Sequence, residues 1–434
     1  MKFIEPRLLK GFRDFLPEDM LLRQKVISII REIFELHGFL PLETPTLEYL
    51  DILSGKYGEE ADKLIFHFKD HGERDVALRY DLTVPFARVI AQYQELARPF
   101  RRYQIQPVWR ADKPQKGRFR EFYQCDCDII GAEDVTAEYE VISIIYDSLK
   151  ALGFKKFVIK INHRQVLNGL LSLTGLDQSY ISPLCRSIDK LDKIGTDGVK
   201  EELLRNGFSE KSTEEIITVL SSGTTSIIEE IDGITSSIAN DAIVQKALTD
   251  IKTLFGYFKS AGIPEENYTF DISLARGLDY YTGMVFETVV SEPKIGSITG
   301  GGRYDELIGM FAKERIPAVG TSLGLERIIE VIKAFNLLEI PRNVSKALVV
   351  NFSEETTEYT VKIAHLLRSN GIGCEIYPEK AKLAKQIKYA DKLHIPFVLI
   401  AGNEEMADET VLVKILENGT QERIKLQKLP VFLK

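Results

Sequence analysis

A stretch rich in basic residues, 98–121, has the side chains best suited to binding an anion. It contains eight arginines or lysines but only Asp112 and Glu121 as acids, in a chain whose formal net charge is −8. Guanidinium groups offer paired donors that match the oxygens of phosphates and carboxylates. The stretch therefore predicts contact with an anionic group, although a solvated charged surface would have the same composition.

The residues on either side of this charge predict a β-hairpin. Two runs with alternating side chains, 103–110 and 118–128, flank the connection 112–117, which contains Pro114 and Gly117. Successive side chains of a strand point to opposite faces. One face of the hairpin should therefore carry Gln104, Gln106, Val108, Arg110, Gln124, Asp126 and Asp128. The opposite face of the second strand should carry Cys125, Cys127 and Ile129, which suits a core.

The composition is that of an ordinary globular protein with more than one domain. The 434 residues are 44% hydrophobic and 28% charged, which allows two or three domains with a substantial core. The sequence shows neither an apolar leader nor an apolar span of about 20 residues, so we expect a cytoplasmic protein without a membrane segment. Its four cysteines are too few and too scattered for a disulfide framework or a zinc site, and no protein-bound metal site is predicted.

Three further segments place glycines beside groups that could take part in chemistry. Residues 276–283 read RGLDYYTG, residues 299–305 read TGGGRYD and residues 324–328 read GLERI. None of them has the spacing of a P-loop or of a dinucleotide-binding motif. Glycines allow the backbone to approach a ligand closely, but a flexible turn at 299–305 would need them equally.

Taken together, these segments resemble the class II aminoacyl-tRNA synthetases. Residues 109–131, WRADKPQKGRFREFYQCDCDIIG, resemble motif 2 of that class, and GLERI resembles motif 3. RGLDYYTG resembles a segment peculiar to histidyl-tRNA synthetases and their catalytically altered paralogues. A predicted helix at 18–37, followed by a strand near 39–45, resembles motif 1, which builds the dimer interface in the class. A plain surface helix would show the same pattern.

The resemblance implies an α/β (α+β) fold with an antiparallel class II catalytic sheet. The catalytic domain would span residues 1–335, with an all-helical insertion at 166–252, where apolar residues recur at helical spacing. Residues 343–434 alternate between strand and helix patterns and would form a C-terminal α/β anticodon-binding domain. A dimerisation or small-molecule domain would show the same alternation. One helix of this domain should carry Lys380, Lys382, Lys385, Lys388 and Lys392.

The function implied by the resemblance is that of a histidine–tRNA ligase. Such an enzyme activates histidine with ATP to histidyl-adenylate and pyrophosphate, then transfers histidine to the 3′ end of histidine tRNA, with Mg²⁺ present and as a homodimer. This chemistry needs positioning and charge neutralisation more than covalent help. The alternative is the non-catalytic histidine-sensing regulatory subunit of ATP phosphoribosyltransferase. That subunit typically lacks the phosphate-binding arginines and the C-terminal domain, and this sequence has both.

The resemblance also assigns roles residue by residue. Catalysis would rest on Arg110, Gln124 and Arg276. ATP would be bound by Arg110, Asp112, Arg118 and Arg327. Histidine would be bound by Asp81, Thr83, Gln124, Asp128, Arg276, Tyr280 and Tyr281. The acceptor end of the tRNA would contact Lys113, Gln115 and Lys116. From the pattern alone, Thr83 could instead cap a helix, and Asp81 could pair with Arg79.

Overall fold

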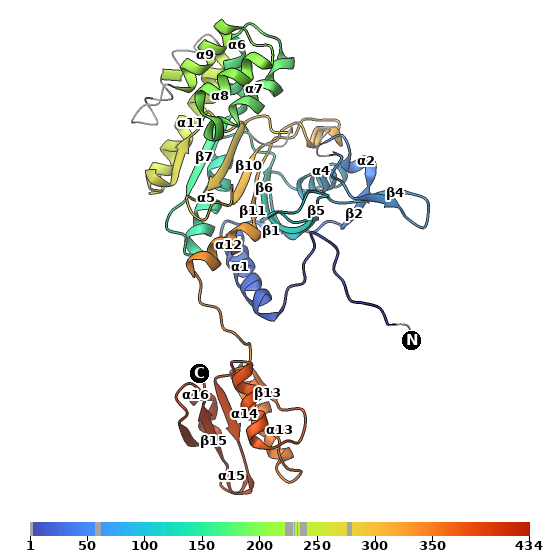
Figure 1. Ribbon diagram of the computed structural model, residues 1–434, viewed down its shortest axis with the longest axis vertical. Helices are drawn as coiled ribbons and strands as arrows, with labels where there is room; N and C mark the ends of the chain where they lie inside the picture. The colour runs from blue at the N-terminus through green and yellow to red at the C-terminus, as the bar shows by residue number, and fades with distance from the viewer. Residues whose placement is uncertain are drawn as a thin grey trace. The chain divides into compact units, whose positions relative to one another are not determined.

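The structure is a computed structural model that describes residues 3–56, 62–115, 117–221, 229, 231, 233, 234, 241–275 and 280–434. The chain divides into two units with separate β-sheets (Figure 1). The larger unit comprises Met1–Asp14 and Arg23–Leu338, and the smaller comprises Phe15–Leu22 and Glu339–Lys434.

An eight-stranded sheet is the centre of the larger unit. Its strands, from one edge to the other, are β1 (Leu40–Pro41), β5 (Phe100–Trp109), β6 (Glu121–Ile130), β11 (Ala318–Gly324), β10 (Thr299–Arg303), β9 (Met284–Val289), β7 (Val158–His163) and β8 (Tyr268–Phe270). Neighbouring strands from β5 to β7 are antiparallel, while the edge strands β1 and β8 run parallel to their neighbours. The predicted α/β fold with a mainly antiparallel sheet is confirmed.

Strands β5 and β6 form the predicted hairpin, although each begins three residues away from its predicted start. In their register Gln104 lies opposite Asp126, and Gln106 lies opposite Gln124. Cys127, on the other face of β6, has no exposed surface. The predicted division of the hairpin into a polar face and a core face is therefore confirmed.

Helix α1 (Pro17–Leu36) matches the helix predicted at 18–37 to within one residue at each end. Val26, Ile30 and Phe34 recur at a spacing of four and are fully buried, as expected for the core-facing stripe of a helix. The ring of Phe34 lies 5.5 Å from that of Tyr103 on β5. The predicted strand after this helix is reduced to the two residues of β1.

Two further helices hold the central strands in place. Helix α5 (Thr136–Ala151) contacts β11, β10 and β6, and helix α12 (Leu325–Phe335) contacts β6 and β11 (Figure 1). Because α12 starts directly after β11, the residues of its first turn lie at the end of that strand. Arg327 is one of them.

A second layer of structure surrounds helix α4 (Thr83–Gln92). It contains α2 (Leu50–Leu53) and a three-stranded sheet in the order β2 (Leu47–Tyr49), β4 (Asp75–Leu78) and β3 (His67–Lys69). The apolar core beneath α4 includes Val84 and Phe86 together with Tyr280 and Tyr304. This core thereby fixes two segments far apart in the sequence to one helix.

Helices dominate the stretch between β7 and β8. Within the described residues these are α6 (Arg164–Leu173), α7 (Ile181–Ile188), α8 (Leu191–Arg205), α9 (Glu210–Leu220) and α11 (Ala242–Ser260). They extend slightly beyond the predicted limits of 166 and 252 at both ends. None of the described helices is both long and apolar enough to cross a membrane.

The smaller unit has a five-stranded sheet in the order β13 (Cys374–Ile376), β12 (Ala347–Val349), β14 (Phe397–Ile400), β15 (Thr410–Ile415) and β16 (Gln421–Lys425). Its helices are α13 (Thr357–Ser369), α14 (Leu383–Lys392), α15 (Asn403–Ala407) and α16 (Leu429–Phe432). The predicted alternation of strands and helices is confirmed. One prediction is wrong: Lys380 and Lys382 precede α14 rather than lying on it.

Candidate active site

A cavity of about 500 Å³ opens along the polar face of β6 in the larger unit. Its lining also includes residues of β9, β10, β11 and α12, the start of α4 with the segment before it, the connection between β5 and β6, and the tyrosine pair. It brings together ten residues of the predicted site: Asp81, Thr83, Arg110, Asp112, Arg118, Gln124, Asp128, Tyr280, Tyr281 and Arg327. Lys113 and Gln115 lie outside this lining, and Arg276 and Lys116 lie outside the described residues.

Three guanidinium groups line the cavity, two from the connection between β5 and β6 and one from α12. Arg110 donates from Nε to the carbonyl of Tyr80 at 3.1 Å, and its guanidinium lies 4.3 Å from the Tyr80 ring centroid and 5.0 Å from that of Phe122. Arg118 donates from Nε to Asp112 at 2.9 Å, and its side chain is 49% exposed. Arg327 donates to the carbonyl of Ser297 at 2.5 Å. Backbone and aromatic contacts thus hold Arg110 in place, and none of these contacts is with a carboxylate. Its guanidinium is therefore suited to binding an external anion.

Asp81 connects the start of α4 to the tyrosine pair. One oxygen accepts a hydrogen bond from the backbone N–H of Val84 at 3.0 Å, and the other accepts from the hydroxyl of Tyr280 at 3.4 Å. The carboxyl group, not Thr83, therefore caps the helix, because Thr83 is the first helical residue. The neighbouring Arg79 is 1% exposed and donates to the carbonyl of Thr44 at 2.7 Å. Asp81 is thus fixed at the cavity wall with 1% of its surface exposed.

Asp128 is held in a buried polar cluster at the other end of β6. Arg102 lies 2.7 Å from one of its oxygens, and the hydroxyl of Tyr304 donates to the other. Burial raises the pKa of Asp128, and the charge of Arg102 opposes that rise. A Cβ atom at Gly320 would lie 1.9 Å from Asp128 Oδ1, so this strand position needs glycine. Neither Arg102 nor Tyr304 was among the predicted site residues.

The three glycines of β10 differ in the space that a side chain would have at each position. A Cβ at Gly301 would lie 2.3 Å from the carbonyl of Gly320, and one at Gly302 would lie 2.6 Å from that of Met284. At Gly300, which lines the cavity, a Cβ would meet no atom within 4 Å. Two of the three glycines therefore permit close strand packing, and the third keeps the cavity floor open. The alternative of a flexible turn is wrong, because the segment is a strand.

Comparison with known proteins identifies the family to which this geometry belongs. Residues 11–328 match the family described as histidyl-tRNA synthetase, and residues 346–434 match the family described as anticodon binding domain. The chain belongs to the histidyl-tRNA synthetase family. A histidine–tRNA ligase from Clostridium tetani is 42% identical over 436 residues, covering 98% of this chain and 97% of that relative.

Solved structures extend the likeness from sequence to fold. The histidyl-tRNA synthetase from Nostoc sp. PCC 7120 has a TM-score of 0.89 and 31% identity, covering 99% of both chains. A structure from Bacillus halodurans, described as an ATP phosphoribosyltransferase regulatory subunit/histidyl-tRNA synthetase, has a TM-score of 0.75 and 25% identity. It covers 89% of this chain and 97% of that one. The chain resembles histidine–tRNA ligases over its full length, and this does not favour the alternative of a regulatory subunit of ATP phosphoribosyltransferase.

In this member of the histidyl-tRNA synthetase family, Glu326 of the GLERI segment braces the cavity wall. It accepts hydrogen bonds from Arg13 at 2.7 Å and from Arg23 at 2.9 Å, and the backbone N–H of Tyr123 lies 3.4 Å from it. Burial alone would raise the pKa of Glu326, but Arg23 and Arg13 lower it overall. The N-terminal segment and α1 are thereby tied to α12, more than 300 residues away in the sequence, without any local sequence signal.

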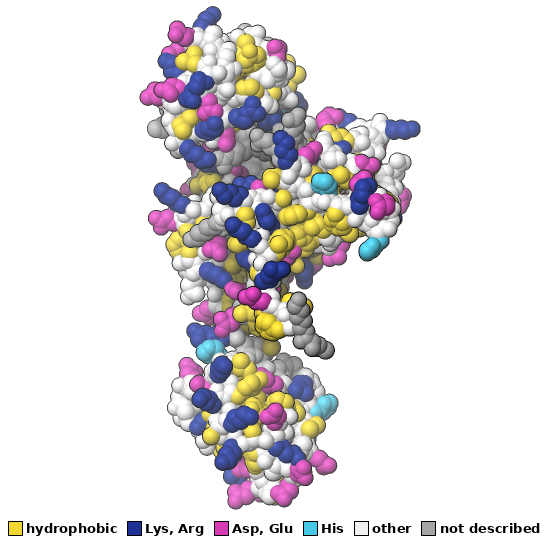
Figure 2. Space-filling view, turned by 45° about the vertical axis from the view of Figure 1, so that its right-hand side comes forward, with side chains coloured by type: hydrophobic (Ala, Val, Ile, Leu, Met, Phe, Trp, Pro, Cys, Tyr) yellow, Lys and Arg dark blue, Asp and Glu magenta, His cyan; other side chains and the backbone are white. Residues whose placement is uncertain are grey.

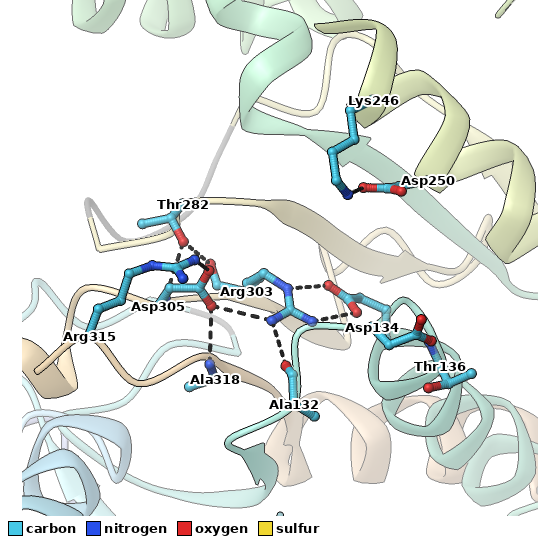
Figure 3. A network of polar contacts seen from close by, with 11 residues as sticks. Ala132, Asp134, Thr136, Lys246, Asp250, Thr282, Arg303, Asp305, Arg315 and Ala318 are labelled. Atoms are coloured by element: carbon cyan, nitrogen blue, oxygen red, sulfur yellow. Dashed lines mark hydrogen bonds and ion pairs between the residues drawn. The ribbon is translucent and has the colours of Figure 1, made fainter. Parts of the chain in front are cut away.

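A second polar network lies at the end of β10 and supports the tyrosine segment (Figure 3). Arg303 donates to both oxygens of Glu138 on α5, at 2.5 and 2.7 Å. Asp305, two residues later, accepts from the backbone N–H of Ala318 at 3.1 Å, and its own N–H donates to the Thr282 hydroxyl at 3.1 Å. Because Thr282 directly follows Tyr281, this network fixes the tyrosine pair to β10 and β11.

Sequence reasoning gave no role to four residues that line the cavity, Asp126, Tyr304, Ser322 and Glu326, or to Arg102, which pairs with Asp128. Strand alternation placed Asp126 on the polar face between Gln124 and Asp128 but gave it no function. Tyr304 directly follows β10 and lies two residues after its last glycine, and that proximity was the available signal. The partners of Arg102 and Glu326 come from other strands and helices, so only the tertiary fold reveals them.

Proposed function

We propose that the chain is a class II histidine–tRNA ligase that forms histidyl-adenylate from histidine and ATP and then charges histidine tRNA. The observation that carries this proposal is the single cavity shared by three arginines and several buried carboxyl groups. Such a cavity offers one end to phosphates and another to a small cationic amino acid. Membership of the histidyl-tRNA synthetase family supports the choice of histidine.

In the first step the carboxylate of histidine attacks the α-phosphorus of ATP, and the bond from that phosphorus to the bridging oxygen of pyrophosphate breaks. Arg110 binds the α-phosphate and stabilises the charge that develops on it, because its guanidinium is already oriented by Tyr80 and Phe122. Arg118 and Arg327 bind the γ-phosphate. Asp112 positions the ATP and orients Arg118. Arg276 is assigned to the α-phosphate by family resemblance.

Histidine is bound at the carboxylate-rich end of the cavity. Asp81, Thr83 and Gln124 bind its amino group, with Tyr280 holding Asp81 in place. Asp128 and Tyr281 contact the imidazole, as an acceptor and as a hydroxyl that can serve either ring nitrogen. A side chain without these nitrogens would leave buried polar groups unpaired, which is the usual source of strong discrimination.

Mg²⁺ would enter this site with ATP. It prefers a few carboxylates together with phosphate oxygens and water, and Asp112 and Glu287 line the cavity. Within the described ranges, no group of three His, Cys, Asp or Glu side chains could hold a metal on its own. These residues fit an ion whose remaining ligands come from the nucleotide, and the ion would neutralise phosphate charge.

The proposal includes two tRNA contacts. The smaller unit reads the anticodon end, which is supported by the match of residues 346–434 to an anticodon-binding family. The connection that carries Lys113, Gln115 and Lys116 contacts the acceptor end. Lys113 and Gln115 are exposed beside the cavity and can reach a phosphate backbone.

We further propose a cytoplasmic homodimer. Figure 2 shows hydrophobic side chains gathered on the face of the larger unit near the three-stranded sheet. Exposed apolar residues of the neighbouring elements include Leu36, Leu40, Leu47, Tyr49 and Phe68. An apolar surface of this kind is suited to pairing with a second copy. Sedimentation of the purified chain would reveal the dimer.

Histidine-dependent exchange of pyrophosphate with ATP tests the proposed activity. Exchange should require histidine and should be absent with glutamine, asparagine or any other standard amino acid. Charging of histidine tRNA by the same preparation tests the second step. A folded protein that binds histidine without exchange would instead support the regulatory alternative.

A further inference from the structure

One carboxyl group of the cavity has no role in the function proposed above. Asp126 lies on β6 between Gln124 and Asp128, lines the cavity and is only 2% exposed. Among the residues that the structure describes, its Oδ1 has no hydrogen-bond partner, and neither has Oε1 of Gln124. Two unpaired acceptors in a buried site are costly unless a ligand supplies donors.

Ser322 orients both of these acceptors. The hydroxyl of Ser322 on β11 forms a hydrogen bond to the carboxyl of Asp126, and the amide nitrogen of Gln124 donates to Ser322 Oγ at 3.0 Å. A hydroxyl has a single proton, so it donates to the carboxyl and accepts from the amide. This relay turns Oε1 of Gln124 away from Ser322 and leaves it, with Oδ1 of Asp126, as an acceptor in the cavity.

Asp128 is not available in the same way, because Arg102 and Tyr304 engage its two oxygens. This end of the cavity contains three carboxyl groups, those of Asp81, Asp126 and Asp128. Among the described residues, Arg102 is the cation that interacts with both Asp126 and Asp128. The surplus of negative charge calls for a cationic ligand. Burial raises the pKa of Asp126 to about 7, opposed by Arg102 and reinforced by Asp128, which supports the same conclusion.

We propose that Asp126 is a further histidine-binding residue, which accepts a hydrogen bond from the α-ammonium group of the substrate beside Gln124. The proposal rests on the proposed function. An ammonium group has three N–H donors and a full positive charge, so Asp81, Gln124 and Asp126 together can satisfy it. A neutral imidazole has one N–H and no charge, and it would not balance the surplus.

The test compares ligands with and without the ammonium group in the full-length protein. Histidine and histidinol carry the group, whereas imidazolepropionate lacks it. Histidine is measured as the substrate of the exchange assay, and the other two are measured as its competitors. Asp126→Asn keeps the size and the contact with Ser322 but removes the charge. It should weaken histidine and histidinol by about ten- to a hundred-fold, the usual range for a hydrogen bond to a charged group, and change imidazolepropionate by less than about two-fold.

Two further measurements guard against a merely structural effect. Ser322→Ala removes the relay without touching a carboxyl group, so it should also weaken histidine more than imidazolepropionate, though by less. The thermal unfolding of each variant is recorded without ligand. Equal weakening of all three ligands, or unchanged binding of histidine in folded Asp126→Asn, would overturn the role of Asp126. Absence of exchange in the unaltered protein would overturn the proposed function instead.

Discussion

The guanidinium of Arg102 on β5 lies 2.7 Å from the carboxylate of Asp128 on β6, and their side chains are 0% and 4% exposed. The two residues lie opposite each other in the strand register, and Tyr304 completes the cluster. A buried ion pair of this kind adds little stability relative to an apolar pair of the same size. Its removal from one side only is costly, because a charge is then left without a partner.

We therefore expect Arg102→Met to lower the free energy of unfolding by about 3–5 kcal/mol. Arg101→Met is the matched control, because Arg101 is the adjacent residue but pairs with Glu140 in partly exposed surroundings. It should cost less than about 1 kcal/mol. Urea unfolding of both variants measures the difference. Similar losses for the two would contradict the special position of the buried pair.

Titration of the buried carboxyl group of Asp126 should make the stability of the folded protein depend on pH. Burial raises its pKa to about 7 in the folded protein, against about 3.9 in an unfolded chain. Between these values the folded state holds a proton that the unfolded state has released, so this group makes stability fall as the pH rises from about 4 to about 7. The charged and titratable groups that interact with it include Asp81, Arg102, Asp128, Tyr281 and Arg79.

Asp126→Asn removes the titrating carboxyl group and should reduce this fall. The variant should therefore lose less stability than the unaltered protein between pH 5 and pH 8. Melting temperatures of the ligand-free proteins across that range provide the measurement. Parallel curves for the two proteins would mean that Asp126 is ionised throughout.

Arg276 is predicted from family resemblance to stabilise the α-phosphate, and it lies outside the described residues. By analogy with loss of an oxyanion donor, Arg276→Ala should slow adenylate formation by about 10²–10³-fold. Binding of histidine and ATP should change much less, because the contact strengthens as charge develops. Arg276→Lys should restore only part of the rate. Single-turnover kinetics measure the rate of adenylate formation. An unchanged rate in folded Arg276→Ala would mean that the residue has no catalytic role.

Ending the chain after Phe335 should separate the two steps of the reaction. The described residues assigned to ATP and histidine all come before that point, whereas α14 and its lysines come after it. Exchange should therefore persist while charging of tRNA is largely lost. Circular dichroism and sedimentation must first show that the shortened protein is folded. Equal loss of both activities would argue against a role of the smaller unit in tRNA binding.

Local patterns in the sequence predicted much of this fold. Strand alternation in 118–128 identified the face that lines the cavity, and spacing of four in α1 identified its buried stripe. These signals are local because side-chain direction repeats every two residues in a strand and about every 3.6 in a helix. Element ends were less accurate, as the lysines before α14 show, since they depend on capping and charge at single positions.

The partners that orient the site could not be predicted in this way. Glu326 is held by Arg13 and Arg23, and Asp128 by Arg102 and Tyr304, each from a distant part of the chain. Nothing in the spacing of these residues indicates the pairing, because strand register and helix packing bring them together. Family resemblance supplied the proposed ligand-binding residues, and the fold revealed the residues that hold them in place.

The glycine at position 320 limits how this site can change over evolutionary time. Any other residue would bring a Cβ to within 1.9 Å of the Asp128 carboxylate and 2.9 Å of the backbone carbonyl of Cys127. The carboxylate has little room to move, since Arg102 and Tyr304 hold it. A change at 128 could relieve only the first of these contacts, because the second is with backbone, so we expect glycine to be retained at 320 among descendants of this chain.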